Sequence, residues 1–133
     1  MAFDRLVENS FPKNDFAIIF NKLSSFEVGM GHWCLLFNSK NTNQFVFVDS
    51  LHNNMDIEVH QIIEQRFSKG DYLITNNMCL QTSFSMICGY LCLFILDLLI
   101  RGFGFRHILL HELNLDSFKQ IEDRVVKRYH EIN

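Results

Sequence analysis

The chain lacks the features that mark several large protein classes. Its 133 residues include only one proline and six glycines, and no tract is typical of a collagen or a flexible linker. Its four cysteines do not have the dense spacing of a small secreted domain held by disulfides. The net charge is −3, whereas non-specific nucleic-acid binding needs clustered Lys and Arg to neutralise phosphates. We therefore expect a protein with reduced thiols and no nucleic-acid partner.

No segment predicts a membrane anchor or a secretory leader. The longest apolar run, residues 87–100, is interrupted by Asp97 and is shorter than the roughly 20 residues that cross a bilayer. The opening Met-Ala-Phe-Asp-Arg has no apolar core of the kind found in signal peptides. We expect an intracellular protein without membrane association.

Apolar and aromatic residues are plentiful. Fourteen phenylalanines and an apolar fraction of 48% supply a dense core, and the length suits one compact domain covering residues 1–133. Four short apolar segments read as β-strands: residues 16–20, 33–37, 45–48 and 71–75. The second and third flank the polar residues 38–43, which predicts an antiparallel hairpin.

Three segments read as helices: residues 57–67, 86–101 and 117–130. We expect Asp56 and Ser117 to cap the first and the last, and Phe67 and Phe118 to join their buried faces. The middle segment is apolar nearly all round, which is typical of a helix in the centre of a domain. The order of elements predicts an α+β fold.

Cys88 is the candidate nucleophile. If Ser85 caps the middle helix, Cys88 lies in its first turn, where the positive end of the helix dipole favours a thiolate. Gly89 leaves the adjacent backbone N–H uncluttered, so that it can face an oxyanion. The alternative is a core cysteine with no chemical role.

His32 and Asp49 are the candidate base and its acid. His32 precedes the first strand of the predicted hairpin and Asp49 follows the second, so antiparallel pairing brings them to the same edge. A carboxylate at that position can orient an imidazole and stabilise its cationic form. The alternative is a pair of polar residues in turns.

Gln81 is the candidate oxyanion donor, since it lies in a loop before Cys88 and carries a side-chain amide. Taken alone it is also an ordinary loop glutamine. Cys88 and Cys92 are four residues apart, but no second Cys or His pair at zinc-like spacing accompanies them. We therefore expect Cys92 to be buried packing, and no metal or cofactor.

These residues occur in three motifs: Gly31-His32-Trp33, Asp49-Ser-Leu51 and the run from Gln81 to Cys88-Gly-Tyr. They resemble the adenovirus-type (adenain-like) and Ulp1-type cysteine proteases, which share the order His-Trp, acid, Gln and Cys-Gly. The acid follows the histidine by seventeen residues, as in that group. The interval of seven residues from Gln81 to Cys88 is closer to the adenovirus enzyme than to the SUMO proteases.

The resemblance implies a papain-like fold and a cysteine endopeptidase with His32 as base, Asp49 as its partner, Gln81 as oxyanion donor and Cys88 as nucleophile. Trp33, Gly31 and Gly89 would contact substrate. The implied substrates are viral capsid or structural precursor proteins, cut in the host cytoplasm or nucleus or in the virion. An activating peptide is a candidate partner, whereas activation by DNA is not expected of an acidic chain.

Three other functions use the same residues. A deconjugase for SUMO or ubiquitin-like modifiers would need a broad docking surface, for which 133 residues leave little room. An acyltransferase would pass the acyl group from Cys88 to an amine in place of water. A non-catalytic interaction module on the same fold would have no reason to keep all four candidate residues.

Overall fold

The structure is a computed structural model that describes residues 16–21, 32–39, 43–82 and 87–132. Within these ranges, no helix is both long enough and apolar enough to cross a membrane.

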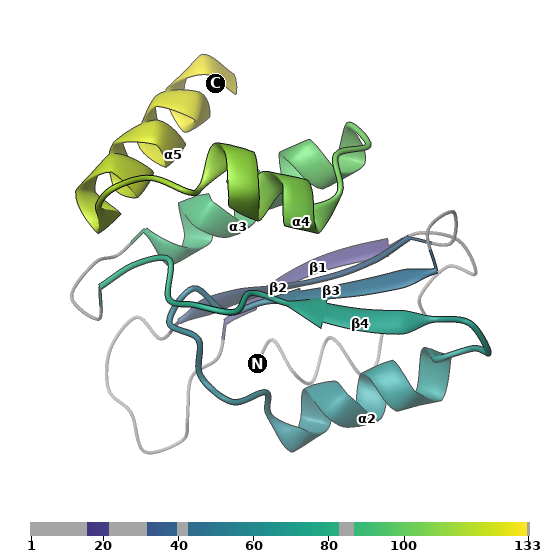
Figure 1. The fold of residues 1–133 in the computed structure, drawn as a ribbon. Coiled ribbons are helices and arrows are strands. Elements are labelled where there is room, and N and C mark those ends of the chain that lie inside the picture. The colour runs from purple at the N-terminus through teal and green to yellow at the C-terminus, as the bar shows by residue number, and fades with distance from the viewer. Residues whose placement is uncertain (1–15, 22–31, 40–42, 83–86, 133) are drawn as a thin grey trace.

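A four-stranded mixed sheet forms the centre of the molecule (Figure 1). Its strands are β1 (Phe16–Asn21), β2 (Trp33–Ser39), β3 (Gln44–Val48) and β4 (Tyr72–Thr75), in the order β1-β2-β3-β4. The first three pair antiparallel, and β4 runs parallel to β3. A parallel neighbour needs a crossover between the two strands, and the helix α2 (Ile57–Arg66) supplies it. All four predicted strands and the predicted hairpin are confirmed.

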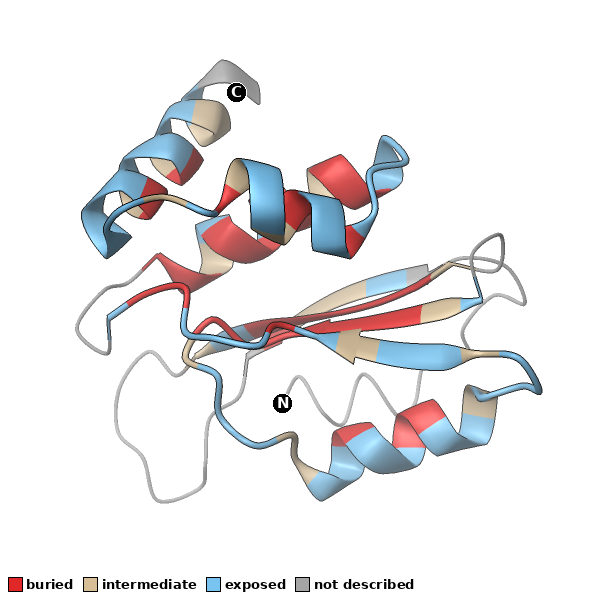
Figure 2. Ribbon diagram, in the orientation of Figure 1, coloured by how far each residue is buried: buried red, intermediate tan, exposed pale blue. Residues whose placement is uncertain are grey.

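Helices cover both faces of this sheet (Figures 1 and 2). The helices α3 (Cys88–Ile100) and α5 (Phe118–Ile132) lie on one side together with α4 (Phe105–His107) and a π-helical turn, η1 (Ile108–Glu112). The helix α2 lies on the other side. The central strands are therefore buried on both faces, which explains why their sequences are continuously apolar.

Side chains alternate between two hydrophobic clusters along the central strands. Leu35 and Phe37 of β2 belong to the larger cluster, with residues of α3 and α5. Cys34 and Leu36 belong to the smaller cluster, with residues of α2. This alternation is the period of two expected of a strand, and it decides which face of the sheet each side chain serves.

The three predicted helices are confirmed, whereas α4 and η1 were not predicted. Both are short, and their two fully buried residues, Phe105 and Ile108, show no repeated helical period in the sequence. The expected burial of Phe67 and Phe118 was wrong, because their side chains are 44% and 42% exposed. Phe67 has an extended backbone just after α2, and Phe118 is the first residue of α5, so both lie beyond the buried turns.

The predicted helix caps are only partly confirmed. The hydroxyl of Ser117 accepts a hydrogen bond from the Gln120 backbone N–H at 3.2 Å, as a capping serine does. Asp56 is the N-cap of α2, but its side chain makes no capping bond. Ser85, the predicted cap of the middle helix, lies outside the described residues.

Candidate active site

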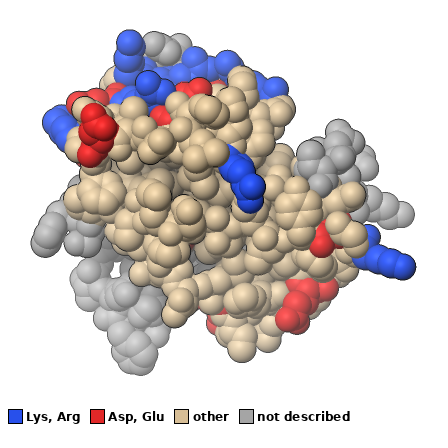
Figure 3. Space-filling view, in the orientation of Figure 1, with Lys and Arg blue, Asp and Glu red and all other residues tan. Residues whose placement is uncertain are grey.

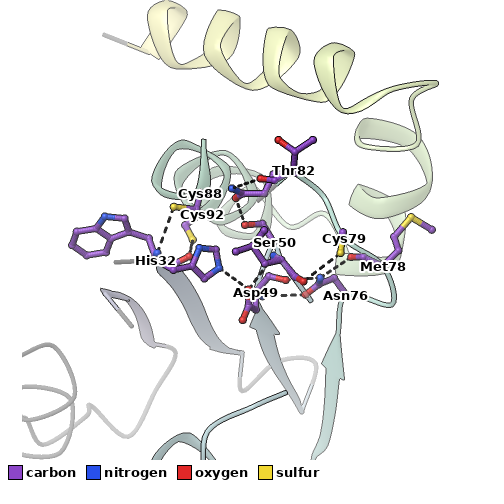
Figure 4. A network of polar contacts seen from close by, with 12 residues as sticks. His32, Asp49, Ser50, Asn76, Met78, Cys79, Thr82, Cys88 and Cys92 are labelled. Carbon is purple, nitrogen blue, oxygen red and sulfur yellow. Dashed lines mark hydrogen bonds and ion pairs between the residues drawn. The ribbon is translucent and has the colours of Figure 1, made fainter. Parts of the chain in front are cut away.

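His32 and Asp49 meet at one edge of the sheet. His32 comes immediately before β2 and Asp49 immediately after β3, and the two strands pair with Leu35 opposite Val48. This register brings the start of one strand beside the end of the other, as the sequence predicted. The His32 ring nitrogen Nε2 lies 2.6 Å from Asp49 Oδ1, within a strong hydrogen bond (Figure 4).

Asp49 is held from several directions. Its side chain is almost fully buried, and Oδ1 also accepts a hydrogen bond of 3.0 Å from the Leu51 backbone N–H. Asn76, the residue after β4, clamps the Asp49 backbone: Asn76 Oδ1 accepts from the Asp49 N–H at 3.1 Å, and Nδ2 donates to the Asp49 carbonyl at 2.7 Å. The carboxylate therefore has little freedom to turn away from His32.

The sequence analysis did not identify Asn76. It is buried and polar, and it directly follows a strand in register with β3, where Phe47 lies opposite Thr75. A polar residue just past a short apolar strand was the available signal. Recognising its meaning required knowing that β3 and β4 are neighbours.

Cys88 lies at the same edge of the sheet, but it belongs to the helix α3, which packs against the sheet. It is the first residue of α3, it is buried, and its Sγ accepts a hydrogen bond of 3.5 Å from the Trp33 backbone N–H. Since Asp49 engages Nε2 of the neighbouring His32, the other ring nitrogen, Nδ1, is the one available to the thiol. Cys88, His32 and Asp49 thus lie next to one another in that order, with the imidazole between the thiol and the carboxylate.

The surroundings favour the charged forms of both reactive groups. Burial acts to lower the pKa of His32, but the hydrogen bond to Asp49 and the neighbouring Cys34 and Cys88 thiols outweigh it and raise the pKa to about 11. Burial acts to raise the pKa of Cys88, but the hydrogen bonds from His32 and the Trp33 N–H lower it below its ordinary value. This is the pattern expected of a thiolate–imidazolium pair.

Gln81 is buried beside this group. The hydroxyl of Ser50 donates a hydrogen bond to Gln81 Oε1, and Gln81 Nε2 donates to the Thr82 carbonyl at 3.3 Å. A backbone hydrogen bond of 2.7 Å, from the Leu80 N–H to the Ser50 carbonyl, connects the loop that carries Gln81 to the segment after β3. Ser50 belongs to the Asp49-Ser-Leu51 motif, but no role for it could be predicted from the sequence.

Trp33 lies beside Cys88. Its indole is 37% exposed, and a Cβ atom added to Gly89 would lie 3.5 Å from its Cδ1. The tryptophan therefore packs close to the backbone next to Cys88. Its expected contact with substrate stays a prediction. Gly31, the third expected substrate contact, lies outside the described residues.

Of the remaining cysteines, Cys92 is buried as the sequence predicted. Cys92 is buried in α3, its thiol donates to the Trp33 carbonyl at 3.6 Å, and burial raises its pKa well above the ordinary value. Cys79 is exposed. Cys34 is fully buried, and its thiol lies close to the side chains of His32 and Asp49.

Among the described residues, only His32, Cys34 and Asp49 bring three metal-ligating atoms together, within 4.8 Å of one another. A direct His32–Asp49 hydrogen bond and the pairing of β2 with β3 account for this closeness without an ion.

No protein-family model matches the chain, and no curated protein matches it. Among solved structures, the chain is similar to a crystal structure of the pS273R protease of ASFV, with a TM-score of 0.63 and 18% sequence identity. The similarity covers 84% of this chain and 43% of the other, so the chain spans less than half the length of that protease. The fold is the α+β, papain-like fold of viral cysteine proteases, as the sequence predicted.

Proposed function

We propose that the chain is a cysteine endopeptidase. The observation that carries this proposal is the convergence of His32, Asp49 and Cys88 at one sheet edge, with the Nε2–Oδ1 hydrogen bond of 2.6 Å and a thiol of lowered pKa. The similarity in fold to a viral protease supports it independently.

The proposed reaction begins with the Cys88 thiolate and the His32 imidazolium. The thiolate attacks the carbonyl carbon of a peptide bond, and the electron pair of the C=O moves to oxygen. The Gln81 amide and the Cys88 backbone N–H stabilise this oxyanion, and losing one such donor typically costs about 3 kcal/mol in the barrier. His32 then protonates the leaving amine, and the oxyanion collapses to an acyl-cysteine.

Water completes the cycle. His32, now neutral, removes a proton from a water molecule that attacks the thioester carbonyl. Collapse of the second oxyanion releases the carboxylic acid and restores the thiolate, while His32 regains its charge. Asp49 keeps Nε2 in its donor form and stabilises the imidazolium throughout.

We propose protein substrates, specifically capsid or structural precursors of a virus, since the structural neighbour is a viral protease. An activating peptide remains a candidate partner. The site of action would be the host cytoplasm or nucleus, or the virion.

Nucleic acid is not part of this proposal, since the charges on the face drawn in Figure 3 are mixed. Lys and Arg gather over α5, but acidic side chains lie among them, and a broad face carries few charges of either sign (Figure 3). Lys119 is 2.8 Å from Asp123, Arg124 is 3.0 Å from Glu112, and Arg128 is 3.1 Å from Asp97. These pairs reduce the net charge that phosphates would meet.

The proposal is tested with p-nitrophenyl acetate, a small acyl donor that requires no knowledge of the natural substrate. We expect acetylation of Cys88, located by peptide mass spectrometry, and a burst of p-nitrophenol. Both should be absent in Cys88→Ala and strongly reduced in His32→Ala, with circular dichroism confirming that each variant is folded. Equal p-nitrophenol release by Cys88→Ala would contradict the proposal.

Cleavage assays then separate the substrate classes. We expect a capsid-precursor peptide to be cut and a ubiquitin-like precursor with a C-terminal extension to remain intact. Processing of the ubiquitin-like precursor alone would identify the enzyme as a deconjugase on the same catalytic residues.

A further inference from the structure

Gln81 carries a buried amide whose two ends have opposite properties. Only 4% of the residue is exposed. The oxygen end accepts hydrogen bonds and the nitrogen end donates them, so a half-turn of the amide exchanges acceptor and donor. An oxyanion is stabilised by the nitrogen end and repelled by the oxygen end. The orientation of this amide therefore decides whether Gln81 assists acyl transfer or opposes it.

Two neighbours distinguish the orientations. Nε2 lies 3.3 Å from the Thr82 carbonyl, which can only accept. A flipped amide would place Oε1 against that carbonyl, acceptor against acceptor. On the opposite side, the Ser50 hydroxyl donates to Oε1.

Ser50 is well placed to maintain this arrangement. It follows Asp49 directly at the end of β3, it is 3% exposed, and its carbonyl accepts the 2.7 Å hydrogen bond from Leu80, the residue before Gln81. Burial limits exchange of the side-chain hydrogen bond with water. The close view shows Asp49 and Ser50 side by side, with a dashed line from Asp49 to His32 (Figure 4). The Ser50 hydroxyl donates to the Gln81 amide.

We propose that Ser50 is a positioning residue of the oxyanion hole, whose hydroxyl holds the Gln81 amide with its donor end toward the oxyanion. Two adjacent residues would then orient the two groups that assist Cys88. Asp49 would orient the base, His32, and Ser50 would orient the oxyanion donor, Gln81. The inference rests on the proposed function, because an oxyanion forms only if Cys88 attacks an acyl carbon.

The test compares two reactions of the same thiol. Acetylation of Cys88 by p-nitrophenyl acetate passes through an oxyanion, whereas alkylation by iodoacetamide is a direct displacement at carbon that forms none. We expect Ser50→Ala to slow acetylation roughly tenfold and Gln81→Ala roughly a hundredfold, by loss of one oxyanion donor. Alkylation of both variants should stay within about twofold of the parent, since a group acting only on the oxyanion leaves thiolate reactivity unchanged.

A double variant shows whether the two residues act together. If Ser50 acts through Gln81, then Ser50→Ala/Gln81→Ala should acetylate no more slowly than Gln81→Ala alone. Asn38→Ala is the matched control, because it removes a buried side-chain hydrogen bond at the far end of β2. It should leave both rates at the parental value.

Three outcomes would overturn the inference. Parental acetylation by Ser50→Ala, beside an impaired Gln81→Ala, would leave the proposed function standing and remove the role of Ser50. Single effects that multiply in the double variant would show that Ser50 acts independently of Gln81. Equal losses of acetylation and alkylation in Ser50→Ala would show that it supports the thiolate instead. Failure of the proposed function is separate, because the parent itself would then not acetylate Cys88.

Discussion

At the scale of single residues, the protonation of His32 reflects a competition. Burial opposes the imidazolium, while the Asp49 carboxylate and two neighbouring thiols favour it, and the favourable contacts prevail. The pKa rises from 6.5 to about 11. The folded protein therefore binds the His32 proton more tightly than the unfolded chain does, and protonation of His32 stabilises the fold.

This shift predicts how stability depends on pH. A group whose pKa is raised on folding contributes fully below its unfolded pKa, and the contribution is lost as pH rises through the folded value. In a Cys88→Ala background, which removes the titration of the thiol, we expect His32→Gln to be most destabilising below about pH 6.5. The penalty should shrink as the pH rises above that value, because Asp49 and Cys34 still raise the pKa of His32 when Cys88 is absent.

Urea unfolding of the two proteins between pH 6 and pH 10 provides the measurement. A penalty that stays constant over that range would show that His32 is neutral in the folded protein. A penalty that grows with pH would show that folding lowers the pKa of His32 and does not raise it.

Asn76 is the second residue with a large expected effect. It is buried, and its amide exchanges two hydrogen bonds with the Asp49 backbone and donates a third to the Met78 carbonyl at 2.9 Å. Asn76→Ala leaves buried backbone groups unsatisfied, at about 1–3 kcal/mol for each such group. We therefore expect a loss of about 2–4 kcal/mol in the free energy of unfolding. A loss below about 0.5 kcal/mol, which is typical of surface changes, would contradict the clamp.

At the scale of elements, α3 joins the core to the candidate site. Its first residue, Cys88, presents the thiol, while the turns that follow anchor the helix among residues of the sheet, of α5 and of the segment after α3. The position of the Cys88 thiol therefore depends on hydrophobic packing further along the helix.

Two leucines on α3 allow a matched test of this packing. Leu91 is fully buried, whereas Leu93 in the same helix is 45% exposed. We expect Leu91→Ala to lower the free energy of unfolding by about 2–5 kcal/mol, through lost burial and a residual cavity. Leu93→Ala should lower it by less than about 1 kcal/mol, since that side chain already meets solvent. Equal losses in chemical denaturation would show that α3 is not packed in this orientation.

The element scale also shows what the sequence could predict. The strands and the central helix were predictable, because burial on both faces makes β2, β3 and α3 continuously apolar. The exposure of Phe67 and Phe118 could not be predicted. The period of apolar residues does not show at which residue a helix ends, or how far the element packed against it extends. The short α4 and η1 carry too few turns to display a period.

At the scale of the whole molecule, the candidate site is assembled from segments far apart in the chain. His32, Asp49, Gln81 and Cys88 could be proposed from sequence because their motifs occur in the order of a known family. Ser50 and Asn76 could not be given roles, because these depend on which segments meet. Ser50 reaches Gln81 across 31 residues, and Asn76 reaches Asp49 across 27.

The central claim is that Cys88 and His32 form a thiolate–imidazolium pair, and the pH dependence of Cys88 alkylation tests it most directly. The rate of iodoacetamide labelling at Cys88, read by peptide mass spectrometry, would be compared in the parent and in His32→Ala. Exposed Cys79 serves as an internal reference in both proteins.

We predict that Cys88 of the parent labels rapidly well below the ordinary thiol pKa of about 8.5, and that His32→Ala abolishes this advantage. Labelling of Cys88 that follows the same pH profile in both proteins, near that ordinary value, would contradict the ion pair and the function built on it.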